Sequence, residues 1–222
     1  KFNFLSITFK NLHMAKYVFE QDTNDPQQYY WFKNALSKEE VDRVIAAAEK
    51  LPIHRATTIG SDGQVTEAND PNGVRSSMVK WIPQRNEWDW LYNRMKELCL
   101  EANNTLWKFD LHSAPEQIQY TEYYDHENGH YDWHQDIGPG DLPSRRKISI
   151  TIQLSDGDEY QGGDLQITSG GNGPDGLMPT MTCPRGAGVG VLFPSYMMHR
   201  VSPVKQGTRK SLVLWVGGAH YK

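Results

Sequence analysis

The chain has 222 residues, 38% of them apolar, and a formal net charge of -4 at pH 7. This length and apolar content suit one domain, residues 1–222, with a sizeable core, and the weakly acidic balance offers no basic stripe of the kind that binds nucleic acid. The two cysteines, Cys99 and Cys183, are too few for a disulfide framework, which favours a reducing, cytoplasmic compartment.

Residues 1–13 contain only a brief apolar run, which polar residues interrupt. The run is too short and too polar for a signal peptide or a membrane span, so no membrane association is expected. The segment Met14-Ala15-Lys16 is typical of an initiation site. We therefore expect residues 1–13 to be either vector-derived or a mobile extension.

Residues 14–115 are predicted to form a helical leading region. Ser37 and Glu40 make a capping box, and the apolar spacing after it predicts a first helix that ends near Lys50. Asn86 offers a cap for a second helix. Leu51–Val74 is rich in turn residues and is expected to be a long polar loop, either a solvated connection or a lid over a substrate. The apolar stripes are Val41, Val44, Ile45 and Ala48 in the first helix and Trp88, Leu91, Met95, Leu98 and Ala102 in the second.

Residues 116–222 have a different pattern, in which short alternating or β-branched runs are separated by Gly, Pro and Asp turns. Such a pattern is typical of a closed double sheet. We predict an α+β fold whose N-terminal helices back one sheet of a β-barrel or jelly-roll core. The predicted strands are Gln117–Tyr124, Lys147–Leu154, Asp164–Thr168, Val189–Phe193 and Arg209–Val216.

Three potential metal ligands occur in the order His134, Asp136, His199. In an extended strand, residues two apart return to the same face about 6.6 Å further on, so His134 and Asp136 can reach one ion. His199 can approach from another strand and complete a 2-His-1-carboxylate set, which suits non-haem Fe(II). Arg209 and Ser211 then place a cation and a hydroxyl on one strand face, where a carboxylate could dock.

A second metal pattern overlaps this region, because residues 126–130 read His-Glu-x-x-His. A zinc peptidase would use His126, Glu127 and His130, but it needs a helix to bring the two histidines to one metal. Asn128 and Gly129 are poor helix formers, and the tyrosines on both sides prefer strands. The segment is better interpreted as a strand, an Asn-Gly turn and a second strand.

Longer motifs surround the metal triad. Asp158–Leu165 resembles the Gly-Gly-acidic turn, and Gly190–Pro194 with His199–Val204 resembles the distal-histidine strand pair, of the Fe(II)/2-oxoglutarate-dependent dioxygenases. The chain looks like their prolyl 4-hydroxylase-like group, which includes the PKHD-type hydroxylases, and Val74–Ser77 and Trp81–Pro83 also resemble that group's leading region. The resemblance spans most of the chain and implies a cupin-like double-stranded β-helix core.

The resemblance also implies site roles. His134, Asp136 and His199 would bind Fe(II), with 2-oxoglutarate and O2 as cosubstrates and ascorbate as an optional addition. Tyr124, Arg209 and Ser211 would hold the 5-carboxylate of 2-oxoglutarate. Tyr123 is a rival to Tyr124, because neighbours on a strand face opposite ways. The substrate pocket is expected to include Tyr131 and Trp215.

The implied reaction is hydroxylation of an unactivated C–H bond with release of succinate and CO2. A carboxylate at Asp136 favours hydroxylation over halogenation, because a small residue there would leave room for a halide. A peptidyl prolyl residue of a protein substrate is the expected target. Alternatives are a small-molecule or free amino-acid hydroxylase, the zinc peptidase, and a non-catalytic β-barrel binding module; a groove lined by the Leu51–Val74 loop would favour a peptide, and a closed pocket a small substrate.

Overall fold

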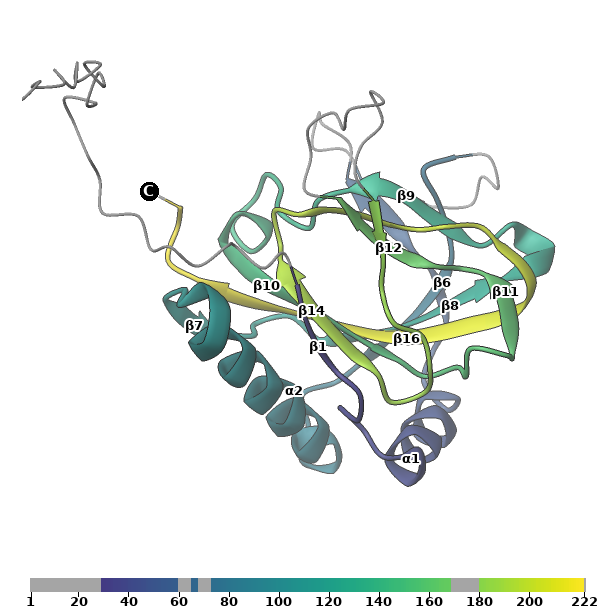
Figure 1. The fold of residues 1–222 in the computed structure, drawn as a ribbon, viewed down its shortest axis with the longest axis horizontal. Coiled ribbons are helices and arrows are strands. Elements are labelled where there is room, and N and C mark those ends of the chain that lie inside the picture. Colours follow the sequence, from purple (N-terminus) through teal and green to yellow (C-terminus); the bar gives the residue numbers. More distant parts are fainter. Residues whose placement is uncertain (1–28, 60–64, 68–72, 169–179, 222) are drawn as a thin grey trace, which may run out of the picture.

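The computed structural model describes residues 29–59, 65–67, 73–168 and 180–221. The expectations for residues 1–13 lie outside this part of the chain. Figure 1 shows two layers of strands, with α1 (Lys38–Ala48) and α2 (Asp89–Ala102) on the outer side of one of them. This arrangement confirms the predicted α+β class with helices backing one sheet.

The larger sheet has nine strands within the described residues. Its order is β1-β14-β10-β16-β8-β6-β2, and the long strand β16 also pairs with β7 and β11 at its two ends. The pairing is antiparallel throughout. Its strands are β1 (Tyr30–Phe32), β2 (His54–Arg55), β6 (Met78–Ile82), β7 (Leu111–Ser113), β8 (Ile118–Tyr124), β10 (Arg146–Gln153), β11 (Tyr160–Gly162), β14 (Gly190–Pro194) and β16 (Val204–Gly218).

A smaller sheet of five described strands has the order β13-β12-β15-β9-β5. The pair β3 (Thr57–Ile59) and β4 (Val65–Glu67) lies apart from both sheets, so the segment expected to be one long loop contains short strands. Part of that segment lies outside the described residues. The strands of the smaller sheet are β5 (Arg75–Ser76), β9 (His130–His134), β12 (Leu165–Thr168), β13 (Thr180–Thr182) and β15 (Met198–Val201).

Both helices pack on the larger sheet through the predicted apolar stripes. The capping box at the start of α1 is present, with Ser37 and Glu40 exchanging backbone-to-side-chain hydrogen bonds. Asn86 does not cap α2, because it is the first residue of the 3-10 turn Asn86–Trp88. The helix begins directly after that turn and has no side-chain cap. No helix among the described residues is long and apolar enough to cross a membrane.

The central strands of the larger sheet separate two environments by strict alternation. One face carries Ile148, Ile150 and Ile152 of β10 together with Leu212 and Leu214 of β16, which pack against the helices in the main core. The opposite face carries polar residues that line a cavity between the two sheets: Gln119, Ser149, Thr151, Arg209 and Ser211. Since successive strand residues point to opposite faces, the same strands build both the core and the site.

Candidate metal centre and active site

The two histidines of the predicted triad are direct neighbours across the smaller sheet. His134 ends β9, His199 lies in β15, and their Cα atoms are paired in the antiparallel register. Their rings are tilted with centroids 4.1 Å apart. The pairing brings together two residues that lie 65 positions apart in the sequence.

Asp136 joins them from just beyond the end of β9. The strand ends at His134, and the Asp136 amide donates to the Ser195 carbonyl at 2.9 Å, which turns the chain toward β15. Oδ1 of Asp136 lies 3.7 Å from Nε2 of His134, and Oδ2 lies 3.5 Å from Nε2 of His199. One potential ligand atom from each residue lies within 4.8 Å of the others, a spacing that fits one ion.

Backbone carbonyls fix both imidazoles in the form a metal needs. Nδ1 of His134 donates to the Asp132 carbonyl at 2.7 Å, and Nδ1 of His199 donates to the Met197 carbonyl at 2.9 Å. A carbonyl oxygen can only accept, so the proton of each neutral ring lies on Nδ1. Nε2 then carries a free lone pair directed at the other two groups.

The protonation states agree with metal binding. Burial, with the neighbouring His199, lowers the pKa of His134 to about 3, so its ring is neutral. Burial alone would raise the pKa of Asp136, but the two imidazoles, the Ser149 hydroxyl and the Arg146 guanidinium outweigh it and lower the pKa to about 2. The Ser149 hydroxyl donates to Oδ2 of Asp136 at 2.6 Å. His134 and Asp136 are therefore deprotonated at neutral pH.

The triad opens into a cavity of about 470 Å³ between the two sheets. Arg209 lies in its wall on β16, 2% exposed, with Nη2 donating to Oε1 of Gln153 at 2.9 Å and Nη1 donating to the Ser211 hydroxyl at 3.3 Å. Its Nε has no hydrogen-bond partner, and no carboxylate among the described residues pairs with it. A buried guanidinium held only by neutral groups is a site for an anion.

The structure corrects the choice of tyrosine beside Arg209. Tyr123 is its cross-strand partner on β8, and the Arg209 guanidinium carbon lies 5.3 Å from the Tyr123 ring centroid. Tyr124 does not line the cavity; its hydroxyl donates to Glu122 on the other side of the strand. The motif spacing predicted Tyr124, with Tyr123 as its rival, and could not decide which of the two faces inward.

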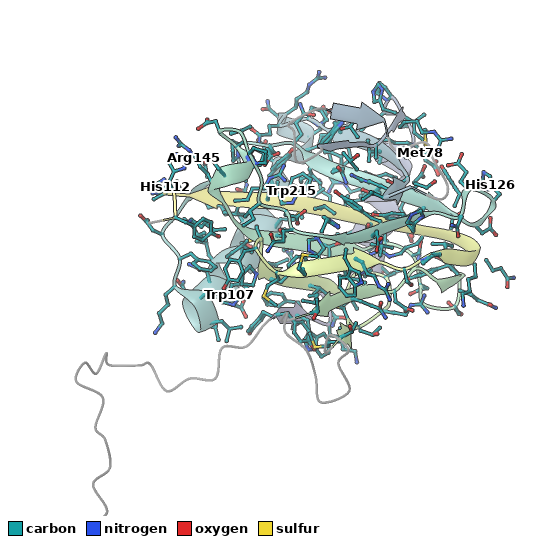
Figure 2. The ribbon with its side chains drawn as sticks, turned by 90° about the horizontal axis from the view of Figure 1, so that it is seen from above. Met78, Trp107, His112, His126, Arg145 and Trp215 are labelled. Carbon is teal, nitrogen blue, oxygen red and sulfur yellow. The ribbon has the colours of Figure 1, made fainter. Side chains whose placement is uncertain are left out.

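Two further predicted residues line the cavity. Tyr131 stacks on His134 with ring centroids 3.5 Å apart. Trp215 follows Arg209 and Ser211 on the same face of β16, and its buried indole N–H has no hydrogen-bond partner. Trp215 lies near the middle of the molecule (Figure 2).

The His-Glu-x-x-His segment does not form a metal site. Asp125–Glu127 is a single 3-10 turn, and Asn128 in the left-handed conformation ends it, as the turn chemistry predicted. His126 is exposed at the edge of the molecule (Figure 2), and Glu127 pairs with Arg55. Both ring nitrogens of His130 face backbone carbonyls, those of Asn128 and Gly73, at 2.7 Å. Neither histidine therefore offers a ligand atom to a shared ion.

The paired glycines of the predicted turn explain how Arg209 stays packed. Gly163 has a φ of +62°, and a Cβ at that position would lie 3.2 Å from Cδ of Arg209. At Gly162, with a φ of +71°, a Cβ would lie 2.1 Å from the Pro203 carbonyl oxygen. Only glycine fits both the backbone conformation and the available space.

Sequence reasoning missed three residues of the site: Ser149 against Asp136, Gln153 against Arg209, and Arg75 in the cavity wall. Each lies in a segment whose sequence pattern predicts only a strand or part of the leading region. The alternation of polar residues in Arg146–Gln153 was the available signal, since an outward-facing strand side would have carried charges.

Comparison with known proteins decides the family. The family model of the 2OG-Fe(II) oxygenase superfamily matches residues 118–217. A PKHD-type hydroxylase of Synechococcus elongatus is 31% identical over 184 residues, which cover 79% of this chain and 76% of the relative. One from Acinetobacter baumannii is 32% identical over 194 residues, covering 82% and 75%. The chain belongs to the 2OG-Fe(II) oxygenase superfamily.

Solved structures of this superfamily share the fold. A Pseudomonas putida prolyl-4-hydroxylase superposes with a TM-score of 0.60 at 22% identity, over 86% of this chain and 93% of that one. A Trichoplax adhaerens prolyl hydroxylase in complex with a hypoxia inducible factor peptide superposes with a TM-score of 0.63 at 15% sequence identity. The match covers 86% of this chain and 84% of that one. These likenesses confirm the predicted double-stranded β-helix core. Family membership implies Fe(II), 2-oxoglutarate and O2. Two imidazoles with free Nε2 lone pairs, a carboxylate, and a buried arginine that pairs with no carboxylate of the described residues fit these groups.

Proposed function

We propose that this chain is an Fe(II)- and 2-oxoglutarate-dependent hydroxylase in which His134, Asp136 and His199 hold the metal and Arg209, Ser211 and Tyr123 hold the 5-carboxylate of 2-oxoglutarate. The observation that carries the proposal is that the triad and the Arg209 guanidinium, which no described carboxylate pairs with, line the same cavity from opposite sheets. A dicarboxylate can then bind at both ends, one at the metal and one at Arg209.

Fe(II) and its cosubstrates would supply the oxidation, whereas the protein side chains would orient the reacting groups. Fe(II) with 2-oxoglutarate and O2 supplies oxidation: the 2-oxo acid becomes succinate and CO2, and one oxygen atom enters a C–H bond. The chain supplies orientation and exclusion of water. Ser149 fixes the Asp136 carboxylate, two carbonyls fix the imidazoles, and the cavity wall buries Arg209 to 2% exposure, which strengthens its attraction for an anion.

We propose a peptidyl substrate, with a prolyl residue as the target. Support comes from the fold neighbour whose structure contains a bound peptide. The cavity also has aromatic walls suited to a pyrrolidine ring, Tyr131 on one side and Trp215 on the other, and Trp81 at its rim is 40% exposed.

The buried, free thiols of Cys99 and Cys183 support a reducing, cytoplasmic location. Ascorbate belongs to the proposal as an assay additive that keeps iron reduced.

The first experiment needs no substrate. Fe(II) and 2-oxoglutarate are added to the purified chain without oxygen, and the visible charge-transfer band of a chelated 2-oxo acid is recorded. The band is expected in the wild type and absent in Asp136→Ala, while Asp132→Ala, which removes an exposed carboxylate four residues earlier in β9, retains it. Absence of the band from metal-loaded wild type, or its persistence in Asp136→Ala, contradicts the proposed ligand set.

The substrate class is tested by succinate release. Proline-containing peptides, the same peptides with alanine for proline, and free amino acids are compared at equal concentration. Release that depends on the prolyl residue within a peptide supports the proposal, and mass spectrometry should then show an added 16 Da on that residue. Release with free amino acids alone would assign the chain to small-molecule hydroxylation.

A further inference from the structure

Arg75 is a second buried arginine in the cavity wall, opposite the sheet that carries Arg209. It is 6% exposed and lies in β5, paired with Tyr131 of β9. Its guanidinium carbon lies 4.5 Å from the Tyr131 ring centroid, and that ring stacks on His134 at 3.5 Å. The Tyr131 ring therefore lies between Arg75 and the proposed metal ligand His134.

Neutral groups orient this guanidinium without balancing its charge. Nε donates to the Ser77 hydroxyl at 2.8 Å, and Nη1 makes a long contact of 3.4 Å to the Thr57 carbonyl. Nη2 has no hydrogen-bond partner within the described part of the chain, and no carboxylate there lies within 4.0 Å of Arg75. The other two arginines of the wall differ, since Arg55 pairs with Glu127 and Arg146 with Glu116.

When Fe(II) and 2-oxoglutarate are bound, the positive charge of Arg75 has no counter-charge among the described residues that line the cavity. Of the described residues that line the cavity, Asp136 alone carries a carboxylate. Fe(II) brings two positive charges and Arg209 one, and these are balanced by Asp136 and the two carboxylates of 2-oxoglutarate. A buried positive charge with no counter-charge is costly, so a further anion is expected beside Arg75.

We propose that Arg75 binds a carboxylate of the prime substrate, so that this enzyme oxidises a carbon a few bonds from a free acid group. This inference rests on the proposed function and adds the substrate's charge to it. Two sources share the chemistry: the C-terminal carboxylate of a peptide or amino acid, and the side chain of an aspartate or glutamate next to the target. Arg75 would be a specificity-determining residue, with a guanidinium fork suited to a bidentate carboxylate.

The test uses the full chain loaded with Fe(II) and saturating 2-oxoglutarate, without oxygen. The probes are the N-acetyl amino acids as free acids, the matching N-acetyl amino-acid amides, and the amides of N-acetylaspartate and N-acetylglutamate. Binding is measured by ligand-observed NMR and by perturbation of the charge-transfer band. The best acid should bind the wild type at least about tenfold more tightly than its amide, the size expected for one charge-assisted contact.

Arg75→Met should abolish this acid preference while changing 2-oxoglutarate affinity less than twofold, and Arg75→Lys should keep part of it. Arg55→Met combined with Glu127→Gln removes a cavity-wall pair of no net charge and should retain the preference. Preference for the free acids assigns a C-terminal carboxylate, and preference for the two acidic amides assigns a side chain.

Three results would overturn the proposal: no acid preference in the wild type, a preference that survives Arg75→Met, or loss of 2-oxoglutarate binding in Arg75→Met, which would make Arg75 part of the cosubstrate site. If Arg75→Met does not fold, the same comparison is made with Arg75→Lys, whose preference must fall at least about threefold because the fork is lost. Failure of the charge-transfer band itself would count against the proposed function, independently of Arg75.

Discussion

The Ser149 hydroxyl donates to Oδ2 of Asp136 at 2.6 Å across 13 residues of sequence, which makes a buried strand serine the partner of the proposed metal carboxylate. The same hydroxyl lies 3.0 Å from the Ser195 hydroxyl. Partners of this kind orient a ligand before the metal arrives and commonly change metal affinity by about 10- to 100-fold.

Ser149→Ala should therefore weaken Fe(II) binding by about tenfold while the fold is retained, because the carboxylate loses the donor that fixes its rotamer. Metal titration measures the Fe(II) affinity, and circular dichroism checks that the fold is retained. Ser195→Ala is the matched control, since it removes a buried hydroxyl that contacts Ser149 but not the carboxylate, and it should change affinity less than threefold. Equal effects of the two variants would count against a role for Ser149 in holding Asp136.

Arg209→Ala should weaken 2-oxoglutarate far more than iron. The loss of a buried charge-assisted contact corresponds to about 1.5–3 kcal/mol, or roughly a 10- to 150-fold rise in the dissociation constant. Titration of the charge-transfer band measures the cosubstrate, and a separate metal titration should be unchanged. Lys210→Ala, the next cation on the strand and on its other face, should leave both unaffected; a larger effect at Lys210 would refute the assignment.

Tyr123 and Tyr124 offer a direct test of which side of β8 faces the cosubstrate. Tyr123→Phe should raise the dissociation constant of 2-oxoglutarate by several fold, roughly the 1 kcal/mol of a lost hydrogen bond, because this ring lies against Arg209. Tyr124→Phe should lower stability instead, since its hydroxyl bonds to Glu122 away from the cavity. The reverse pattern would restore the assignment made from the motif spacing.

His130→Ala should retain the metal but destabilise the fold. Both ring nitrogens lie 2.7 Å from backbone carbonyls of the chain that leads into β5 and β9, and the substitution removes the ring N–H that donates to them. We expect a loss of about 1–3 kcal/mol in the free energy of unfolding by denaturant, with unchanged Fe(II) affinity. Loss of metal in His130→Ala, but not in His134→Ala, would revive the zinc interpretation.

The two thiols should resist modification at mildly alkaline pH. Burial raises the pKa of Cys99 from 9.0 to about 12, and burial, only partly offset by Arg209, raises that of Cys183 to about 12. At pH 8 the thiolate fraction falls by about a thousandfold relative to an exposed cysteine, so alkylation by iodoacetamide should be slower by at least that factor.

The raised pKa values of the two thiols also determine how the free energy of unfolding changes with pH. The unfolded chain releases these protons near pH 9.0 and the folded chain only near 12, so stability should fall as the pH rises above about 9. Alanine or serine replacement of both cysteines should remove that part of the alkaline loss. Rapid labelling of the native protein at pH 8 would show that the thiols are accessible.

The sequence by itself determined the strand and helix pattern, the order of His134, Asp136, His199 and Arg209, and the rejection of the His-Glu-x-x-His helix. These features depend on local propensity, on turn chemistry and on spacing within one segment, which are written in neighbouring residues. The α1 capping box and the alternation along β16 were predictable for the same reason.

Only the tertiary structure decided which of two adjacent tyrosines faces Arg209, that Ser149 and Gln153 hold the site, and that Arg75 has no carboxylate partner among the described residues. Each depends on the register between strands that are far apart in the sequence, and a shift of one residue would turn every side chain to the other face. Strand pairing within each sheet and the packing of the two sheets against each other, which no local pattern encodes, therefore set the chemistry of the cavity.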